Sequence, residues 1–62
     1  MSEPDRLARL RHDLANPLAA LLAETQLMLL SDTSMEDEVR RGLQEIEKLS
    51  IRMRTILRAD PT

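Results

Sequence analysis

Two runs of apolar residues at helical spacing constrain the fold of this chain most strongly. In the first run, leucines and other apolar residues recur three or four positions apart between Leu7 and Leu29. The second run has the same spacing and consists of Met35, Val39, Leu43, Ile46, Leu49, Met53 and Ile56. Such spacing gathers side chains on one face of an α-helix. The polar cluster at residues 31–34 separates the runs and is typical of a turn. The sequence therefore predicts helices over about residues 4–30 and 35–58, joined by a turn at 31–34.

Capping residues support both helix starts. Ser2 precedes Asp5 by three positions, as in a capping box, and a proline lies between them in the first turn. Before the second helix, two pairs have the same spacing, Thr33 with Glu36 and Ser34 with Asp37. Inside that helix, Gly42 costs up to about 1 kcal/mol relative to alanine, and the sequence alone gives no account of it.

Length and composition favour self-association. The chain has 62 residues, no cysteine and no aromatic residue, so neither disulfides nor large rings can reinforce its core. A single helical hairpin cannot cover its own apolar stripes, whereas two hairpins can do so as a four-helix bundle. We therefore expect one all-α domain over residues 1–62, an antiparallel two-helix hairpin that dimerises into a four-helix bundle.

Charge and hydropathy exclude several classes of protein. Nine basic and eleven acidic residues give a net charge of -2, which argues against nucleic-acid binding. The apolar runs are short and the N-terminus, MSEPDR, lacks the apolar core of a signal peptide, so we expect a cytoplasmic location without membrane contact by this segment. One histidine without cysteine is a poor ligand set, so no metal site is expected.

The lone histidine, His12, is predicted to point away from the core. At about 100° per residue, it lies roughly 150° from the centre of the first apolar stripe, and Asn16 shares its face one turn later. Further along this face come the small and apolar side chains of Ala19, Ala20, Ala23 and Leu27. An accessible strip of this kind indicates a partner docking surface. The alternative is that alanine is there simply because it favours a helix.

Pro17 is the second unusual residue of this segment. It has no backbone N–H, so the carbonyl of Asp13 loses its usual helical partner, and the ring pushes against the preceding turn. The unbroken stripe through Leu14, Leu18 and Leu21 favours a bent helix over two separate helices. The bend is expected beside His12.

The run HDLANPL at residues 12–18 resembles the H-box of sensor histidine kinases, which belongs to their dimerisation and histidine-phosphotransfer domain. The pattern of that family is His, then Asp or Glu, two residues, Asn or Thr, Pro and an apolar residue. Each of these places matches here. The resemblance extends over the whole chain, because the family domain is also a helical hairpin that dimerises into a four-helix bundle.

The resemblance implies a role for each residue of the motif. His12 would accept the γ-phosphoryl group of ATP and pass it to an aspartate of a response regulator. Asp13 would accept a hydrogen bond or a proton from the imidazole. Asn16 would orient a water that dephosphorylates the regulator. Pro17 would supply the bend that lets the catalytic parts reach His12.

The chain departs from a complete kinase in one respect. It has one glycine and no phosphate-cradling loop, so ATP and its magnesium ion would belong to a separate ATP-binding domain, and no cofactor is expected in this chain. That domain would act in cis if the chain is a kinase module, or in trans if it is a free-standing phosphotransfer protein. The other expected partners are a second copy and the receiver domain of a response regulator. The competing hypothesis is a non-catalytic dimerisation or adaptor module that binds a partner protein.

Overall fold

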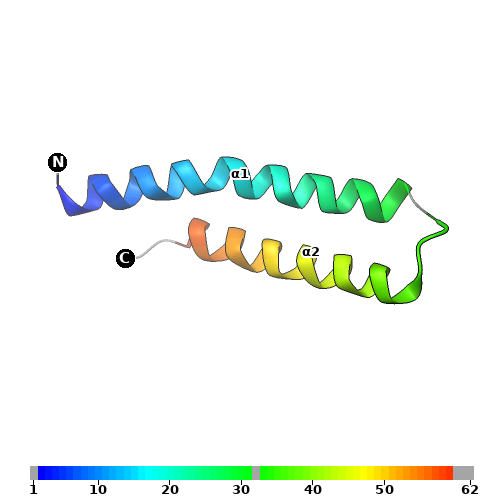
Figure 1. Ribbon diagram of the computed structural model, residues 1–62. Coiled ribbons are helices and arrows are strands. Elements are labelled where there is room, and N and C mark those ends of the chain that lie inside the picture. Colours follow the sequence, from blue (N-terminus) through cyan, green and yellow to red (C-terminus); the bar gives the residue numbers. More distant parts are fainter. Residues whose placement is uncertain (1, 32, 60–62) are drawn as a thin grey trace.

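The protein is an antiparallel pair of helices. The computed structural model describes residues 2–31 and 33–59. Helix α1 spans Glu3–Ser31 and helix α2 spans Asp37–Arg58, and the described residues contain no strand. The two helices lie side by side along a body about 50 Å long, with the N-terminal turns of α1 extending past the end of α2 (Figure 1). The predicted all-α hairpin is confirmed, and its assembly into a four-helix bundle stays a prediction.

The predicted cap at the start of α1 is present. The backbone N–H of Asp5 donates to Ser2 Oγ at 3.3 Å, and the Ser2 hydroxyl donates to Asp5 Oδ2 at 2.8 Å. The Ser2 side chain thus satisfies one of the free N–H groups of the first turn.

The N-cap of α2 is neither Thr33 nor Ser34. Glu36 occupies the N-cap position with extended backbone, φ -63° and ψ 150°, and its own side chain makes no capping hydrogen bond. Because the chain stays extended through Glu36, α2 begins at Asp37, two residues later than expected.

Arg40 ties the start of α2 to the end of α1. Its guanidinium donates to the backbone oxygen of Leu29 at 3.3 Å. The last turn of α1 contains no basic residue of its own, although a helix C-terminus exposes unpaired carbonyls that favour positive charge. The guanidinium of Arg40 on the second helix therefore acts as a C-terminal cap of α1 and links the two helices next to the turn.

The helices touch along a narrow line, here called the contact seam. Its buried centre consists of Leu22, Thr25 and Ser50, which are 5%, 4% and 1% exposed. The half-buried residues extend it at spacings of three, four and, from Arg11 to Leu18, seven: Arg11, Leu18 and Leu29 on α1, and Arg40, Leu43, Glu47, Arg54 and Leu57 on α2. Three of these five α2 residues are polar, and so is Ser50, the most buried residue, so the seam has little apolar area.

Two hydroxyls at the seam are satisfied within their own helices. Thr25 Oγ1 donates to the Leu21 carbonyl and Ser50 Oγ to the Ile46 carbonyl, each at 2.7 Å. Among the described residues, no buried side-chain polar atom is left without a partner. A small side chain whose hydroxyl donates to the carbonyl four residues earlier in its own helix leaves no buried polar group unpaired. Such side chains let the two helix backbones approach closely.

Most of the apolar residues lie outside the contact seam. We call this set the apolar stripe: Leu7, Leu10, Leu14, Leu21 and Met28 on α1, with Val39, Ile46, Leu49, Met53 and Ile56 on α2, all of them exposed. Leu22 is the single buried hydrophobic residue of the described chain. The expectation that one hairpin cannot cover its own apolar stripes therefore holds. Each helix covers only the contact seam of the other, and the apolar stripe lies next to that seam.

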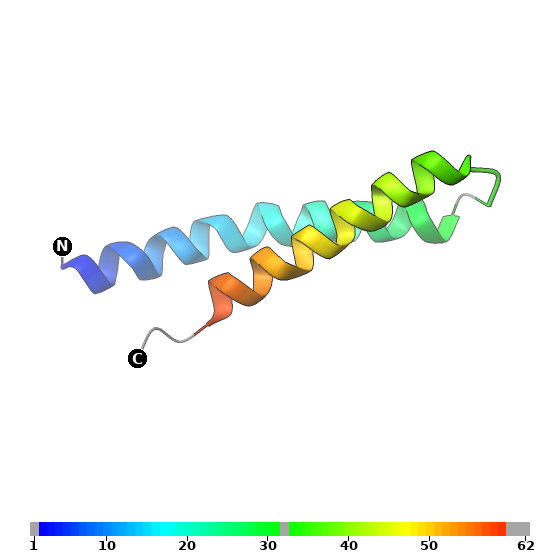
Figure 2. The ribbon, with the colours of Figure 1, turned by 90° about the horizontal axis from the view of Figure 1, so that it is seen from below.

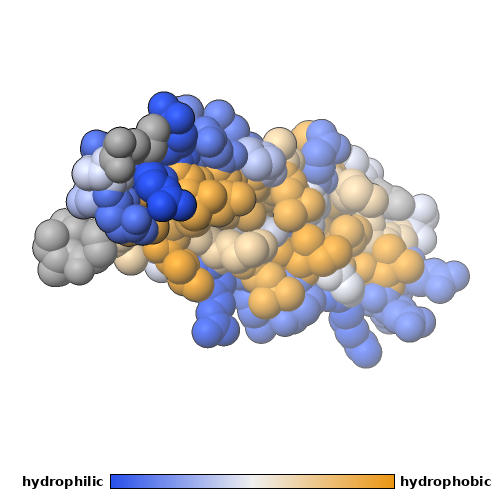
Figure 3. All heavy atoms as spheres, turned by 60° about the vertical axis from the view of Figure 1, so that its left-hand side comes forward, coloured by the Kyte–Doolittle hydropathy of each residue, from blue (hydrophilic) through white to orange (hydrophobic). Residues whose placement is uncertain are grey.

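The two halves of the apolar stripe face the same side of the hairpin. A groove of about 330 Å³ joins them, lined by Leu14, Pro17, Leu18, Leu21, Met53 and Leu57. Figure 3 shows a face of the molecule on which apolar side chains form a continuous band between charged margins. Figure 2 shows α2 crossing α1 obliquely.

Helix α1 is also long and apolar enough, by length and composition, to cross a membrane. The short uninterrupted apolar runs of the sequence predict no membrane-spanning segment. The window that meets the criterion also includes the alanines between the leucines. Core helices of soluble proteins and N-terminal signal sequences satisfy the same criterion. The cytoplasmic location stays a prediction.

Enlarging Ser50 should separate the helices. We expect Ser50→Leu to lower the free energy of unfolding by about 1–3 kcal/mol, because the added carbons have no room where the backbones approach. Ser50→Ala, the control, keeps the close approach and should change stability by less than about 1 kcal/mol. Thermal denaturation followed by circular dichroism at equal concentrations measures both. Equal stability of the two variants would contradict a tight crossing at Ser50.

Candidate functional site

His12 lies on the outer face of α1, in free contact with solvent. Its side chain is 78% exposed, and the residues on the same face, one and two turns later, are exposed as well. The contact seam and the apolar stripe occupy the other two sides of α1, so among the described residues neither of them covers the imidazole. The predicted outward orientation matches this placement.

Asp13 is a charged neighbour of the imidazole. Its Oδ1 lies 3.6 Å from His12 Nδ1, and its side chain is 67% exposed. This distance is too long for a hydrogen bond, so the pair is an ion pair only when the imidazole is protonated. Because Nδ1 is the nitrogen on the side of Asp13, Nε2 is the nitrogen left free for other partners.

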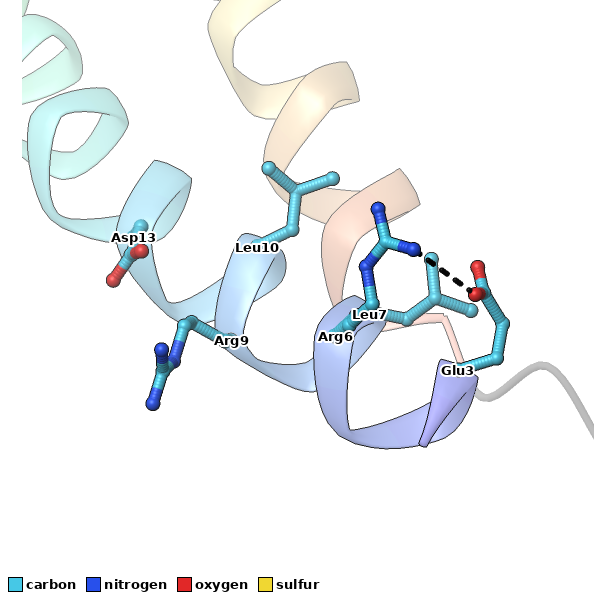
Figure 4. Close-up of a pocket in the computed structure, with 6 residues that line it drawn as sticks. All are labelled: Glu3, Arg6, Leu7, Arg9, Leu10 and Asp13. Atoms are coloured by element: carbon cyan, nitrogen blue, oxygen red, sulfur yellow. Dashed lines mark ion pairs between the residues drawn. The ribbon is translucent and has the colours of Figure 1, made fainter. Parts of the chain in front are cut away.

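The first turns of α1 form an open hollow next to Asp13. Figure 4 shows the residues that line it: Glu3, Arg6, Leu7, Arg9, Leu10 and Asp13. Arg6 is paired with Glu3 at 3.6 Å, whereas Arg9 points outward near Asp13. All of these residues are on one helix, so the described part of α2 contributes no wall to the hollow.

Asn16 and Pro17 follow on the next turn of the helix. Asn16 is exposed on the same side as His12, one turn away. Helix α1 continues without a break through Pro17, which excludes the alternative of two separate helices (Figure 1). Pro17 lines the apolar groove, so its ring is directed away from the His12 face.

The residues of the expected docking strip, Ala19, Ala20, Ala23 and Leu27, are all exposed. Leu30 extends the strip and is 80% exposed. At the edge of the strip, Ala19 lines a small cleft between the helices together with Ala15, Leu18, Leu22, Arg54, Leu57 and Arg58. Sequence reasoning did not place α2 beside this strip, because the pairing of the two helices is needed to bring Arg54 and Arg58 there.

The end of the hairpin that carries His12 is basic. Residues 2–16 and 51–59 contain six basic and three acidic residues. The basic ones come from both helices: Arg6, Arg9, Arg11, Arg52, Arg54 and Arg58. The overall charge of -2 conceals this asymmetry, because the acidic residues are concentrated toward the turn.

The described residues contain no group of three His, Cys, Asp or Glu side chains close enough to hold a metal ion. Comparisons of the chain with protein-family models, with curated proteins and with solved structures give no match.

Replacing Pro17 should stabilise the hairpin. In Pro17→Ala, the new N–H can bond to the Asp13 carbonyl, so we expect the free energy of unfolding to rise by up to about 3 kcal/mol. Leu18→Ala, the neighbouring control, removes a half-buried leucine of the contact seam and should lower it. Chemical denaturation measures both. A loss of stability in Pro17→Ala would mean that packing in the apolar groove depends on the proline ring.

Proposed function

We propose that this chain is the dimerisation and phosphoacceptor module of a two-component histidine kinase system. The observation that carries the proposal is the exposure of His12, within an H-box-like run, on a continuous helix whose other two sides are the contact seam and the apolar stripe. A histidine kept for packing would be buried, and a phosphoacceptor must be open to two large partners in turn.

The phosphoryl step uses the nitrogen that faces away from Asp13. The lone pair of His12 Nε2 attacks the γ-phosphorus of ATP, a nitrogen–phosphorus bond forms, and the bond to the bridging oxygen breaks as ADP leaves. ATP and magnesium are held by a separate ATP-binding domain, in cis or in trans. In the second transfer, a carboxylate oxygen of the response regulator attacks the same phosphorus, and the electron pair returns to Nε2.

Two neighbours of His12 assist without forming covalent bonds. Asp13 Oδ1 lies 3.6 Å from His12 Nδ1. After a small rotation of either side chain, the carboxylate would accept a hydrogen bond from Nδ1–H, which favours the tautomer whose Nε2 carries no proton. Asn16 positions a water for dephosphorylation of the regulator, since an amide can hold water but cannot act as a strong base. At Pro17 a backbone hydrogen bond is missing, so α1 can bend there and let the catalytic groups of the partner domain reach His12.

The proposed dimer follows from the exposed apolar stripe. Contiguous exposed apolar surface on this scale is uncommon in a stable monomer, and the one hydrophobic residue buried in the described part of the chain is too little core for a chain of this size. A second copy that packs stripe against stripe forms a four-helix bundle. The His12 face and the docking strip lie outside that interface, so assembly leaves them open.

The partner surface includes the docking strip and its basic border. The receiver domain would contact the strip of Ala19, Ala20, Ala23 and Leu27, whose small side chains allow close approach. The arginines at this end attract a phosphoryl group or an acidic partner. The exposed Leu27 and Leu30 also suit an adaptor that binds its partner without phosphoryl transfer, which is the second candidate function.

Phosphoryl acceptance in trans decides between these functions. The purified chain is mixed with radiolabelled ATP and isolated kinase ATP-binding domains, and we expect acid-labile label on native protein and none on His12→Ala. A folded chain without label from any donor would favour the adaptor.

Asn16→Ala is the matched control on the same face. We expect it to accept phosphate like the native chain, while it dephosphorylates the regulator more slowly. Equal loss of both activities would contradict the separate roles of His12 and Asn16.

A charge in the apolar stripe should separate the dimer. Leu49 is exposed in a single hairpin, so we expect Leu49→Asp to leave the helices folded but to weaken dimerisation by about a hundredfold or more, since a carboxylate would be buried. The control, Gln44→Asp, places the same residue on the opposite face of α2. Sedimentation equilibrium measures both, and an unchanged mass for Leu49→Asp would show that the stripe is not the interface.

A further inference from the structure

Gly42 belongs to the apolar stripe of α2 by position. It follows Val39 by three residues and precedes Ile46 by four, which are the spacings that join the other members of the stripe. It is the only glycine of the sequence, and it lies in the interior of α2. A residue that weakens a helix interior relative to alanine therefore stands where the pattern calls for an apolar side chain.

Neither of the usual reasons for glycine applies inside one hairpin. Gly42 does not have a positive φ angle, so the backbone does not need its conformational freedom. A Cβ added at Gly42 would meet no atom within 4 Å, so α1 does not approach it. Within a single chain, alanine would fit at this position and favour the helix.

We infer that Gly42 is the point at which a helix of a second copy approaches α2 most closely. This inference rests on the proposed dimer. The occupant is a second copy because the exposed stripe on both sides of Gly42 is the apolar surface that the hairpin leaves uncovered, while one leucine is buried among residues 2–31 and 33–59. Without a side chain, position 42 lets another helix backbone enter the space between Val39 and Ile46, as small residues do at close helix crossings.

The inference predicts opposite effects of one methyl group on helix and dimer. Gly42→Ala should raise the helix content of the monomer at low concentration, because alanine favours the helix. The same substitution should weaken dimerisation by about tenfold or more, because the methyl group would occupy the space of the second backbone. Gly42→Leu should abolish the dimer over the same concentration range.

Sedimentation equilibrium and circular dichroism over a concentration series test this directly. Gln44→Leu is the control, because it adds an apolar side chain to α2 on the face away from the stripe, and its dimer should dissociate like the native one. A Gly42→Ala dimer as tight as the native dimer overturns the inference and leaves the proposed dimer intact. A native chain that stays monomeric overturns both, and phosphoryl acceptance at His12 is measured separately.

Discussion

The close crossing of the two helices at Ser50, Thr25 and Leu22 governs the arrangement of the rest of the molecule. Small side chains whose hydroxyls bond to their own helices hold the backbones near each other. The seam they form is narrow and partly polar, so it contributes little apolar burial. The contact seam fixes the rotation of each helix about its own axis. This rotation determines which residues lie outside the contact between the helices.

Because of this rotation, three sides of α1 carry different sets of residues. One side carries the contact seam, one carries the apolar stripe, and the third carries His12, Asn16 and the docking strip. Because the sides are separate, a second copy can cover the stripe without competing with a partner at His12. The access for successive large partners that the proposed phosphoacceptor role requires is thereby compatible with the additional core that a small chain requires.

The electrostatics of the hairpin also arise from the pairing of the helices. The end with His12 gathers arginines from the start of α1 and from the end of α2, while acidic residues collect toward the turn. At the turn itself, Arg40 of α2 bonds to the Leu29 carbonyl and supplies the positive charge that the end of α1 lacks. A net charge counted over the chain conceals both features, since each depends on residues far apart in sequence.

The sequence by itself determined the two helices, the cap at Ser2 and the outward direction of His12, because these depend on residues three or four positions apart. It predicted continuity through Pro17 for the same reason, since the apolar spacing on either side is unbroken. It misplaced the N-cap of α2, where serine and threonine pairs suited a cap but Glu36, with extended backbone, occupies the position. Only the tertiary structure decided that Ser50 is more buried than any leucine, that Arg54 and Arg58 border the docking strip, and that Gly42 faces open space. These properties depend on the register and rotation of one helix against the other, which local spacing does not specify.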